Sequence, residues 1–296
     1  MGIPESQLET WSHQGSIIQS SSTYATIKNA LESPGSPYAS KSFKVFLQGS
    51  YGNDTNIYSE SDVDVVMRLD STFLPDLTLL PQAQQLAFQG AYTNAEYPLT
   101  QFKSDVLAQL TDKFGAAITS GTKALKIAAS GSRRSADVVV SAQYRRYYRF
   151  ISLSDKRLDE GIWFFQTNAQ VVVNFPIQHS QNCTRKHQAT NSWFKPMVRI
   201  LKNARTKLMD EGLLGSGVAP SYFIEGLLYN VPDVKFGISF EDTFVNAVNW
   251  ISDADRSKFL CANEQHSLLT GDPNVTWSPT KCDEFLNALT ELWKQW

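Results

Sequence analysis

The sequence predicts a mixed α/β fold in which a lobe built on a β-sheet is followed by a helical lobe. The first observation is that β-prone runs gather within residues 1–175, whereas residues 176–296 are mostly helical in pattern. The second is that 42 % of the residues are hydrophobic and 19 % charged, which is ordinary for a globular protein. A chain of 296 residues is long enough for two such lobes, and we expect a cleft between them.

The first lobe begins with a helical pattern and continues with strands. Apolar residues from Leu8 to Leu31 recur at roughly helical spacing, and Ser33-Pro34-Gly35 ends the pattern. Residues 5–32 therefore form one long helix or two abutting ones. Further helices are predicted at 82–91 and 99–114. The predicted strands are 43–48, 63–69, 124–129, 136–143, 161–166 and 171–175, with Pro176 closing the last.

The second lobe is predicted to be helical from Asn191 onward. Asn191 or Ser192 is a suitable N-cap, and Gly212 is a suitable end for this helix. Pro220 favours the first turn of a second helix, which reaches about Asn230. Two more helices are expected near 239–251 and 281–295.

Charge and cysteine content restrict the partners and the compartment. The formal net charge is -2, so the chain lacks the basic excess typical of proteins that bind a nucleic-acid backbone. We expect small anionic ligands and no requirement for duplex nucleic acid. Three widely spaced cysteines favour a reducing compartment over a disulfide scaffold. The first twenty residues do not resemble a signal peptide, and no apolar run approaches the roughly 20 residues that span a bilayer. The expected location is the cytoplasm, with no membrane partner.

The strongest chemical pattern is Gln48-Gly49-Ser50, separated by eleven residues from Asp62-Val63-Asp64. Glycine permits close backbone approach and serine adds a hydroxyl donor, so this turn suits a triphosphate. Asp62 and Asp64 alternate along a strand, which places both carboxylates on one face. Adjacent carboxylates repel one another but bind magnesium well together with substrate phosphates. The alternative is a β-turn with solvated acids ahead of a core strand.

Asp137 is the candidate for a third carboxylate. It opens the apolar strand Asp137-Val138-Val139-Val140, where an acidic residue is unusual and suggests a functional role. A third acid helps to hold a second metal ion and to activate an attacking hydroxyl. The sequence therefore predicts a site for two Mg²⁺ ions, with Mn²⁺ as a substitute, held by Asp62, Asp64 and Asp137.

The Gly-Ser turn and the Asp-x-Asp pair at this separation resemble those of the polymerase-beta-like nucleotidyltransferases. Two further stretches, 194–203 and 219–225, are similar to the bacterial CD-NTases, relatives of cyclic GMP-AMP synthase and oligoadenylate synthase that act in anti-phage (CBASS) signalling. The resemblance covers roughly residues 40–232 and a long N-terminal helix where the family has its spine helix. It implies a catalytic nucleotidyltransferase lobe over 1–175 and a helical substrate-binding lobe over 176–296.

The resemblance also implies roles for individual residues. Ser50, within Gln48-Gly49-Ser50, would bind the donor triphosphate. Lys202 and Ser221 would contact the terminal phosphates, and Tyr222 would stack on a base. Each has a structural alternative: Lys202 lies on a basic helix face of the kind that is usually solvated, and Tyr222 suits a core. Asn174 is either a reader of a base edge or a side chain that satisfies a strand end.

Two other clusters have less specific interpretations. Arginines and tyrosines interleave from Tyr144 to Arg149, which favours an exposed strand with alternating sides over a nucleic-acid contact. His179, Cys183 and His187 are spaced to share a helix face, but zinc needs a fourth ligand and none is near in sequence. The Cys and His cluster that forms the zinc thumb of the animal DNA-sensing enzyme is absent from the sequence.

The resulting hypothesis is a magnesium-dependent nucleotidyltransferase. It would condense ribonucleoside triphosphates into a cyclic di- or trinucleotide, and this messenger would act on a separate effector protein. One alternative is transfer to an RNA or protein acceptor. The other is a nucleotide-binding regulator without catalysis, which the complete set of three acids disfavours.

Overall fold

The computed structural model describes residues 2–15, 17–58, 62–271 and 275–296. The chain forms two compact units. One comprises Met1–Ile17, Gly49–Glu60 and Ile177–Trp296, and we call it the helical unit. The other comprises Ile18–Gln48 and Ser61–Pro176, and we call it the sheet unit.

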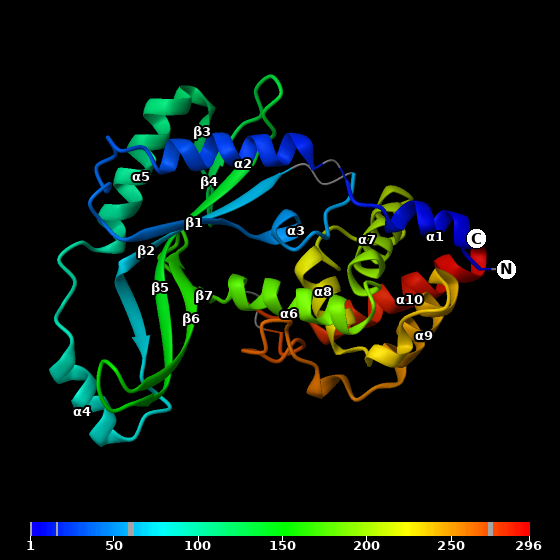
Figure 1. The fold of residues 1–296 in the computed structure, drawn as a ribbon. Coiled ribbons are helices and arrows are strands. Elements are labelled where there is room, and N and C mark those ends of the chain that lie inside the picture. The colour runs from blue at the N-terminus through cyan, green and yellow to red at the C-terminus, as the bar shows by residue number, and fades with distance from the viewer. Residues whose placement is uncertain (1, 16, 59–61, 272–274) are drawn as a thin grey trace. The chain divides into compact units, whose positions relative to one another are not determined.

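The sheet unit contains, among the described residues, seven strands in one mixed sheet (Figure 1). Five follow the order β1-β2-β5-β4-β3, while β6 pairs with β5 and β7 with β6. The pair β2 and β5 is parallel, and the other pairs are antiparallel. The strands are β1 Phe43–Leu47, β2 Val63–Asp76, β3 Ile118–Ser120, β4 Leu125–Ile127, β5 Ala136–Phe150, β6 Lys156–Phe165 and β7 Val171–Asn174.

The first five residues of β2 and of β5, 63–67 and 136–140, are mostly apolar, and both of their faces are covered. Val65 and Met67 are fully buried on one face, and Val66 packs with Val139 on the other. Helices α2 (Ile18–Leu31) and α5 (Leu99–Phe114) contact each other and β2. Helix α4 (Gln82–Ala91) packs on β5 through Phe88. This burial fixes the register of the two strands that carry the acidic residues.

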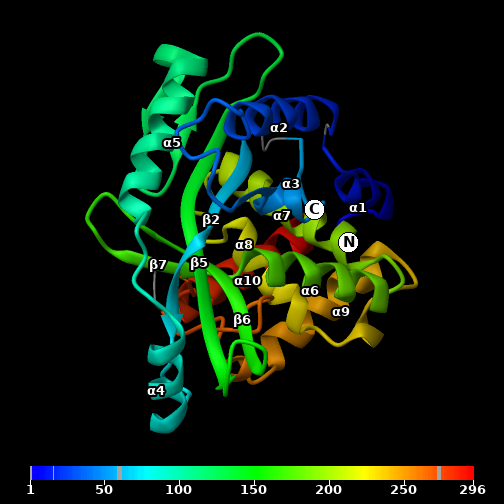
Figure 2. The ribbon, with the colours of Figure 1, turned by 60° about the vertical axis from the view of Figure 1, so that its left-hand side comes forward.

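The helical unit is organised around α7 (Phe194–Asp210), which contacts α1, α8, α9 and α10 (Figure 2). Its core also includes Ile3 and Leu8 from the start of the chain. The other helices of this unit are α1 Glu5–Ser12, α3 Gly49–Gly52, α6 Pro176–Ala189, α8 Ser221–Asn230, α9 Phe240–Asp253 and α10 Pro279–Gln295, and its 3-10 turns are η2 Asp233–Lys235 and η3 Arg256–Lys258. The 3-10 turn η1 Gly115–Ala117 belongs to the sheet unit.

The predicted mixed α/β fold is confirmed, but the N-terminal helical pattern is two helices in two different units. Helix α1 belongs to the helical unit and α2 to the sheet unit. Gly15 lies between them and donates its N–H to the carbonyl of Asn56 at 3.1 Å. A Cβ at Gly15 would lie 2.6 Å from the carbonyl oxygen of Ile57, so only glycine fits this approach. The break is therefore set by packing on the segment after Gly49.

Helix α6 was not expected from the sequence, because Pro176 begins a helix rather than only closing a strand. The predicted cap at Asn191 or Ser192 is also wrong. Both residues have positive φ angles, +48° and +70°, and form the turn between α6 and α7. Helix α7 begins at Phe194 after Trp193, whose side chain makes no cap hydrogen bond. The first N–H groups of the helix, those of Phe194 and Lys195, are accepted by the Thr190 hydroxyl and the His187 imidazole.

The remaining predicted helices lie within a few residues of their expected bounds. Helices α9 and α10 begin at side-chain caps, where Ser239 accepts from the N–H of Asp242 and Ser278 from that of Lys281. Cys183, Cys261 and Cys282 are buried free thiols. In the part of the chain that the structure describes, no helix is both long and apolar enough to cross a membrane. The boundary near residue 175 coincides with the end of the sheet unit, and the assignment of separate functions to 1–175 and 176–296 stays a prediction.

Candidate active site

The strand register of the sheet unit brings the predicted acids together. Asp64 on β2 is the direct partner of Asp137 on the parallel strand β5. Directly paired residues of neighbouring strands point to the same face, and Asp62, two residues before Asp64, is expected to share that face. Asp64 and Asp137 are half-buried, whereas Asp62 is exposed and accepts a hydrogen bond from the Ser135 hydroxyl.

Electrostatics at this cluster fit a divalent cation. Burial raises the pKa of Asp137, Lys126 opposes that shift, and the carboxylate of Asp62 raises the pKa further. Lys126 is the register partner of Asp137 on β4. Three carboxylates against one lysine leave an excess of negative charge, and carboxylate oxygens are the ligands that hard cations such as Mg²⁺ prefer.

The Gly-Ser turn follows β1 and belongs to the helical unit. Gly49 has a φ of +64°, a conformation that glycine adopts without strain. Ser50 is 9 % exposed. The backbone N–H of Asn53 donates to the Gly49 carbonyl and that of Thr55 to the Ser50 carbonyl, at 3.0 and 2.9 Å. Gln48, which precedes the turn in the sheet unit, donates its N–H to the Asp64 carbonyl at 3.0 Å.

The basic face of α7 is not solvated, contrary to the structural alternative that its amphipathic pattern suggested. Lys195 and Lys202 are 7 % and 0 % exposed. Both reach the segment that follows Ser50: Lys195 pairs with the Asp54 carboxylate at 2.8 Å, and the Lys202 ammonium donates to the Thr55 carbonyl at 2.8 Å. A contact of Lys202 with a substrate phosphate stays a prediction.

Ser221 and Tyr222 open α8. Arg205 donates to the Ser221 hydroxyl at 3.5 Å. The ring of Tyr222 stacks on His179 with centroids 4.4 Å apart, and its hydroxyl accepts from Asn263 at 2.9 Å. Burial raises the pKa of Tyr222 well above its ordinary value. One ring face is thus covered by protein, and base stacking by Tyr222 stays a prediction.

Asn174 ends β7 in the sheet unit, and its side-chain oxygen accepts the backbone N–H of Phe175 at 2.8 Å. This contact satisfies a strand end, as the structural alternative expects, and recognition of a base edge stays a prediction. The arginines and tyrosines of β5 have protein partners: Arg146 and Tyr144 both bind Asp76, and Arg149 binds Asp155. The prediction of an exposed strand is nevertheless wrong in part, because Tyr144 and Tyr147 are buried and only Tyr148 and Arg149 are exposed.

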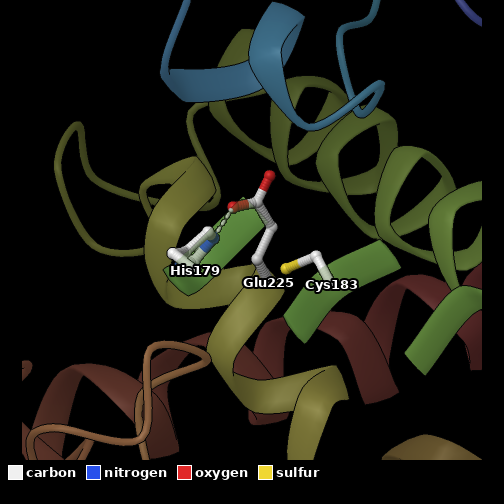
Figure 3. A group of neighbouring side chains, drawn as sticks. All are labelled: His179, Cys183 and Glu225. Carbon is white, nitrogen blue, oxygen red and sulfur yellow. Dashed lines mark hydrogen bonds and ion pairs between the residues drawn. The ribbon is translucent and has the colours of Figure 1, made fainter. Parts of the chain in front are cut away.

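Sequence reasoning missed Glu225, which lies fully buried with His179 and Cys183 in the helical unit (Figure 3). Its carboxylate binds His179 at 2.6 Å and also accepts from Asn53 and Thr55. The available signal was an acid inside the apolar stretch Phe223–Leu228. His187 lies elsewhere and accepts the N–H of Lys195. Although three residue types of this cluster can bind metals, the carboxylate oxygens are already engaged by protein donors.

Comparisons with known proteins found sequences that are similar over the whole length of this chain. Residues 181–294 match the family model of the cGAS/DncV-like nucleotidyltransferase C-terminal helical domain. The chain is 42 % identical to a cyclic UMP-AMP synthase of Rhodothermus marinus, over all of this chain and 99 % of that protein. It is 32 % identical to the cyclic nucleotide synthase CdnE01 of Staphylococcus haemolyticus, over the full length of both.

Solved structures are similar over the same length. The structure of the Rhodothermus marinus CdnE c-UMP-AMP synthase with Apcpp and Upnpp has a TM-score of 0.90, at 43 % identity, over 99 % of this chain and 97 % of that one. The Elizabethkingia meningoseptica CdnE cyclic dinucleotide synthase with GTP and Apcpp has a TM-score of 0.76, at 28 % identity, over 99 % and 98 %.

Proposed function

Since the chain belongs to the cGAS/DncV-like nucleotidyltransferases, we propose that it joins UTP and ATP into a cyclic dinucleotide. Family membership bears out the resemblance drawn from the Gly-Ser turn and the Asp-x-Asp pair, and it identifies the protein as a nucleotidyltransferase. The alternative of a non-catalytic regulator is therefore set aside.

The register of β2 and β5 is the observation that carries the proposal. It pairs Asp64 with Asp137, and Asp62 directly precedes the first residue of β2. The choice of UTP and ATP rests on the relative from Rhodothermus marinus, whose name states a UMP-AMP product and whose structure holds analogues of both nucleotides. That relative is more similar to this chain than the dipurine and dipyrimidine synthases are, since those are 29–32 % identical to this chain.

Nucleotidyl transfer needs a hydroxyl, a phosphorus atom and a leaving group in line. Asp62, Asp64 and Asp137 would hold two Mg²⁺ ions, which neutralise the triphosphate and lower the pKa of the attacking ribose hydroxyl. Each transfer forms one bond from that oxygen to an α-phosphorus, breaks the α–β linkage and releases pyrophosphate. Two transfers close the ring.

The other residues bind and orient the nucleotides. Ser50, with the backbone of Gln48 and Gly49, is assigned to the donor triphosphate, and Lys202 and Ser221 to terminal phosphates. Tyr222 is assigned to stacking and Asn174 to a base edge, because its amide both donates and accepts. The cyclic product would then act on a separate effector protein in anti-phage signalling.

Product analysis tests this function. The protein is incubated with all four labelled ribonucleoside triphosphates, with and without Mg²⁺, and the phosphatase-resistant product is identified by mass spectrometry. We expect a product that contains one uridylate and one adenylate and that requires the metal. Label transferred only to an added RNA or protein acceptor would refute the proposal in favour of an acceptor-directed transferase. A product of other bases would refute the assignment to UTP and ATP.

A further inference from the structure

The turn that carries Ser50 is held by the helical unit through a short segment of its own. Residues 49–58 belong to the helical unit, which contains α7 and α8, rather than to the unit of the strands that flank them in sequence. Within the turn, the N–H of Asn53 bonds the Gly49 carbonyl and that of Thr55 bonds the Ser50 carbonyl. Any group that fixes Asn53 and Thr55 therefore fixes the two peptide groups that flank Ser50.

Glu225 is that group. Its carboxylate accepts from the Thr55 hydroxyl at 2.5 Å and from the Asn53 amide at 3.0 Å. Glu225 is 2 % exposed, while Asn53 and Thr55 are 4 % and 0 % exposed. Figure 3 shows one carboxylate oxygen directed at His179 and the other toward the ribbon of the segment after Gly49. Hydrogen bonds to a buried carboxylate are short and strong, which makes this connection stiff.

Cations surround the carboxylate and the segment that it binds. The Lys202 ammonium donates to the Thr55 carbonyl, and Arg199 donates to the carbonyl of Asp54 at 2.7 Å. Asp54 has a φ of +56°, which is uncommon for a residue with a side chain, and Lys195 binds its carboxylate. The backbone of Asp54 is thus held by Arg199 and its side chain by Lys195.

His179 keeps Glu225 ionised. Burial alone would raise the pKa of Glu225, but His179, Lys202 and the Thr55 hydroxyl lower it overall. An ionised Glu225 accepts hydrogen bonds without donating any, so it matches the two donors that the segment presents. A protonated or amide side chain would offer a donor where both partners also donate.

We infer that Glu225 is a positioning residue for nucleotidyl transfer, which acts through Thr55 and Asn53 to hold the Gly49-Ser50 turn in the shape that binds a triphosphate. This inference rests on the proposed function, in which Ser50 binds the donor triphosphate. Glu225 can act without touching the nucleotide. A displacement of the Gly49-Ser50 turn by a fraction of an ångström would be enough to weaken its hydrogen bonds to the triphosphate.

Matched threonine variants test the inference. Thr55→Val removes the hydroxyl that donates to Glu225. Thr243→Val is the control, because Thr243, on the first turn of α9, is also 0 % exposed in the helical unit. Its hydroxyl donates to the carbonyls of Gly237 and Ser239 and accepts from the Gly237 N–H, all just before α9. Thr55→Ser retains the hydroxyl. Dissociation constants for Mg²⁺-bound inorganic triphosphate, melting temperatures and dinucleotide synthesis are measured for each folded variant.

Thr55→Val is expected to weaken triphosphate binding about tenfold or more. Thr243→Val, with a comparable loss of melting temperature, is expected to bind as the wild type does, and Thr55→Ser to recover wild-type binding. Glu225→Gln, which keeps the shape of the side chain, is expected to weaken binding as Thr55→Val does, and it serves if Thr55→Val does not fold. Unchanged triphosphate affinity in folded Thr55→Val or Glu225→Gln would overturn the inference. Absence of any dinucleotide from the wild-type protein would instead overturn the proposed function.

Discussion

Asp137→Asn separates the catalytic role of the acidic cluster from a structural one. The change removes one carboxylate and keeps the size of the side chain. Adjacent strands lie about 4.8 Å apart. At that separation and an effective dielectric constant of about 20, two carboxylates repel by about 3 kcal/mol. Asp64 and Asp137 are half-buried and Lys126 lies beside Asp137 on β4, so solvent screening and the attraction to this lysine together reduce the net repulsion to about 1 kcal/mol.

Removal of that repulsion should stabilise the protein in the absence of metal. A gain of about 1 kcal/mol raises the melting temperature of a unit of this size by about 2–4 °C. Synthesis of the dinucleotide should fall by at least about 100-fold, because no other group replaces the lost metal ligand. The assays are thermal unfolding in EDTA and initial rates with saturating Mg²⁺.

Asp112→Asn is the control for net charge. Asp112 is an exposed acid on α5, with its side chain 71 % exposed, and the same substitution there should change neither stability nor rate. A variant Asp137→Asn that melts several degrees lower while it retains activity within tenfold of wild type would refute the reasoning. Asp137 would then be a structural residue of β5.

Three further predictions concern binding, pH and activation. Tyr222→Ala should weaken all four nucleoside triphosphates by about 1–3 kcal/mol in titrations and leave inorganic triphosphate unaffected; a lower melting temperature with intact affinity would identify Tyr222 as a core residue. Burial lowers the pKa of His179, but Cys183 and Glu225 raise it well above 6.5 overall. The imidazolium therefore stabilises the folded protein fully below about pH 6.5, the pKa in the unfolded chain, and this stabilisation is lost as the pH rises through the pKa of the folded protein. Denaturant unfolding from pH 6 to 10 should show this decline in the wild type but not in His179→Gln, and equal slopes would contradict it. Duplex DNA or RNA should not accelerate synthesis, and an acceleration that disappears at high salt would show that a nucleic acid activates the protein.

Local chemistry in the sequence was sufficient for most of the elements. The apolar run of β2, the serine caps of α9 and α10 and the proline before α8 act over a few residues, so neighbours in sequence determine them. The acidic pair at the start of β2 and the single acid on β5 were also evident, because a charged residue at the head of an apolar strand is unusual.

Contacts between distant segments decided the rest. Nothing near Asp137 in sequence specifies that it pairs with Asp64, since that register depends on how β2 and β5 are buried. The amphipathic pattern of α7 is the same whether its basic face meets water or protein. In the tertiary structure Lys202 is buried and donates to the Thr55 carbonyl.

The sequence by itself determined the class of fold, the positions of most helices and strands and the residue types of the acidic cluster, because each depends on local periodicity or on an exceptional residue. The tertiary structure alone decided that the N-terminal helical pattern divides at Gly15, that α6 begins at Pro176, and that Glu225 holds the segment after Ser50. The physical reason is that close backbone approach and buried polar pairing depend on groups separated by up to 172 residues, and local propensity carries no information about such partners.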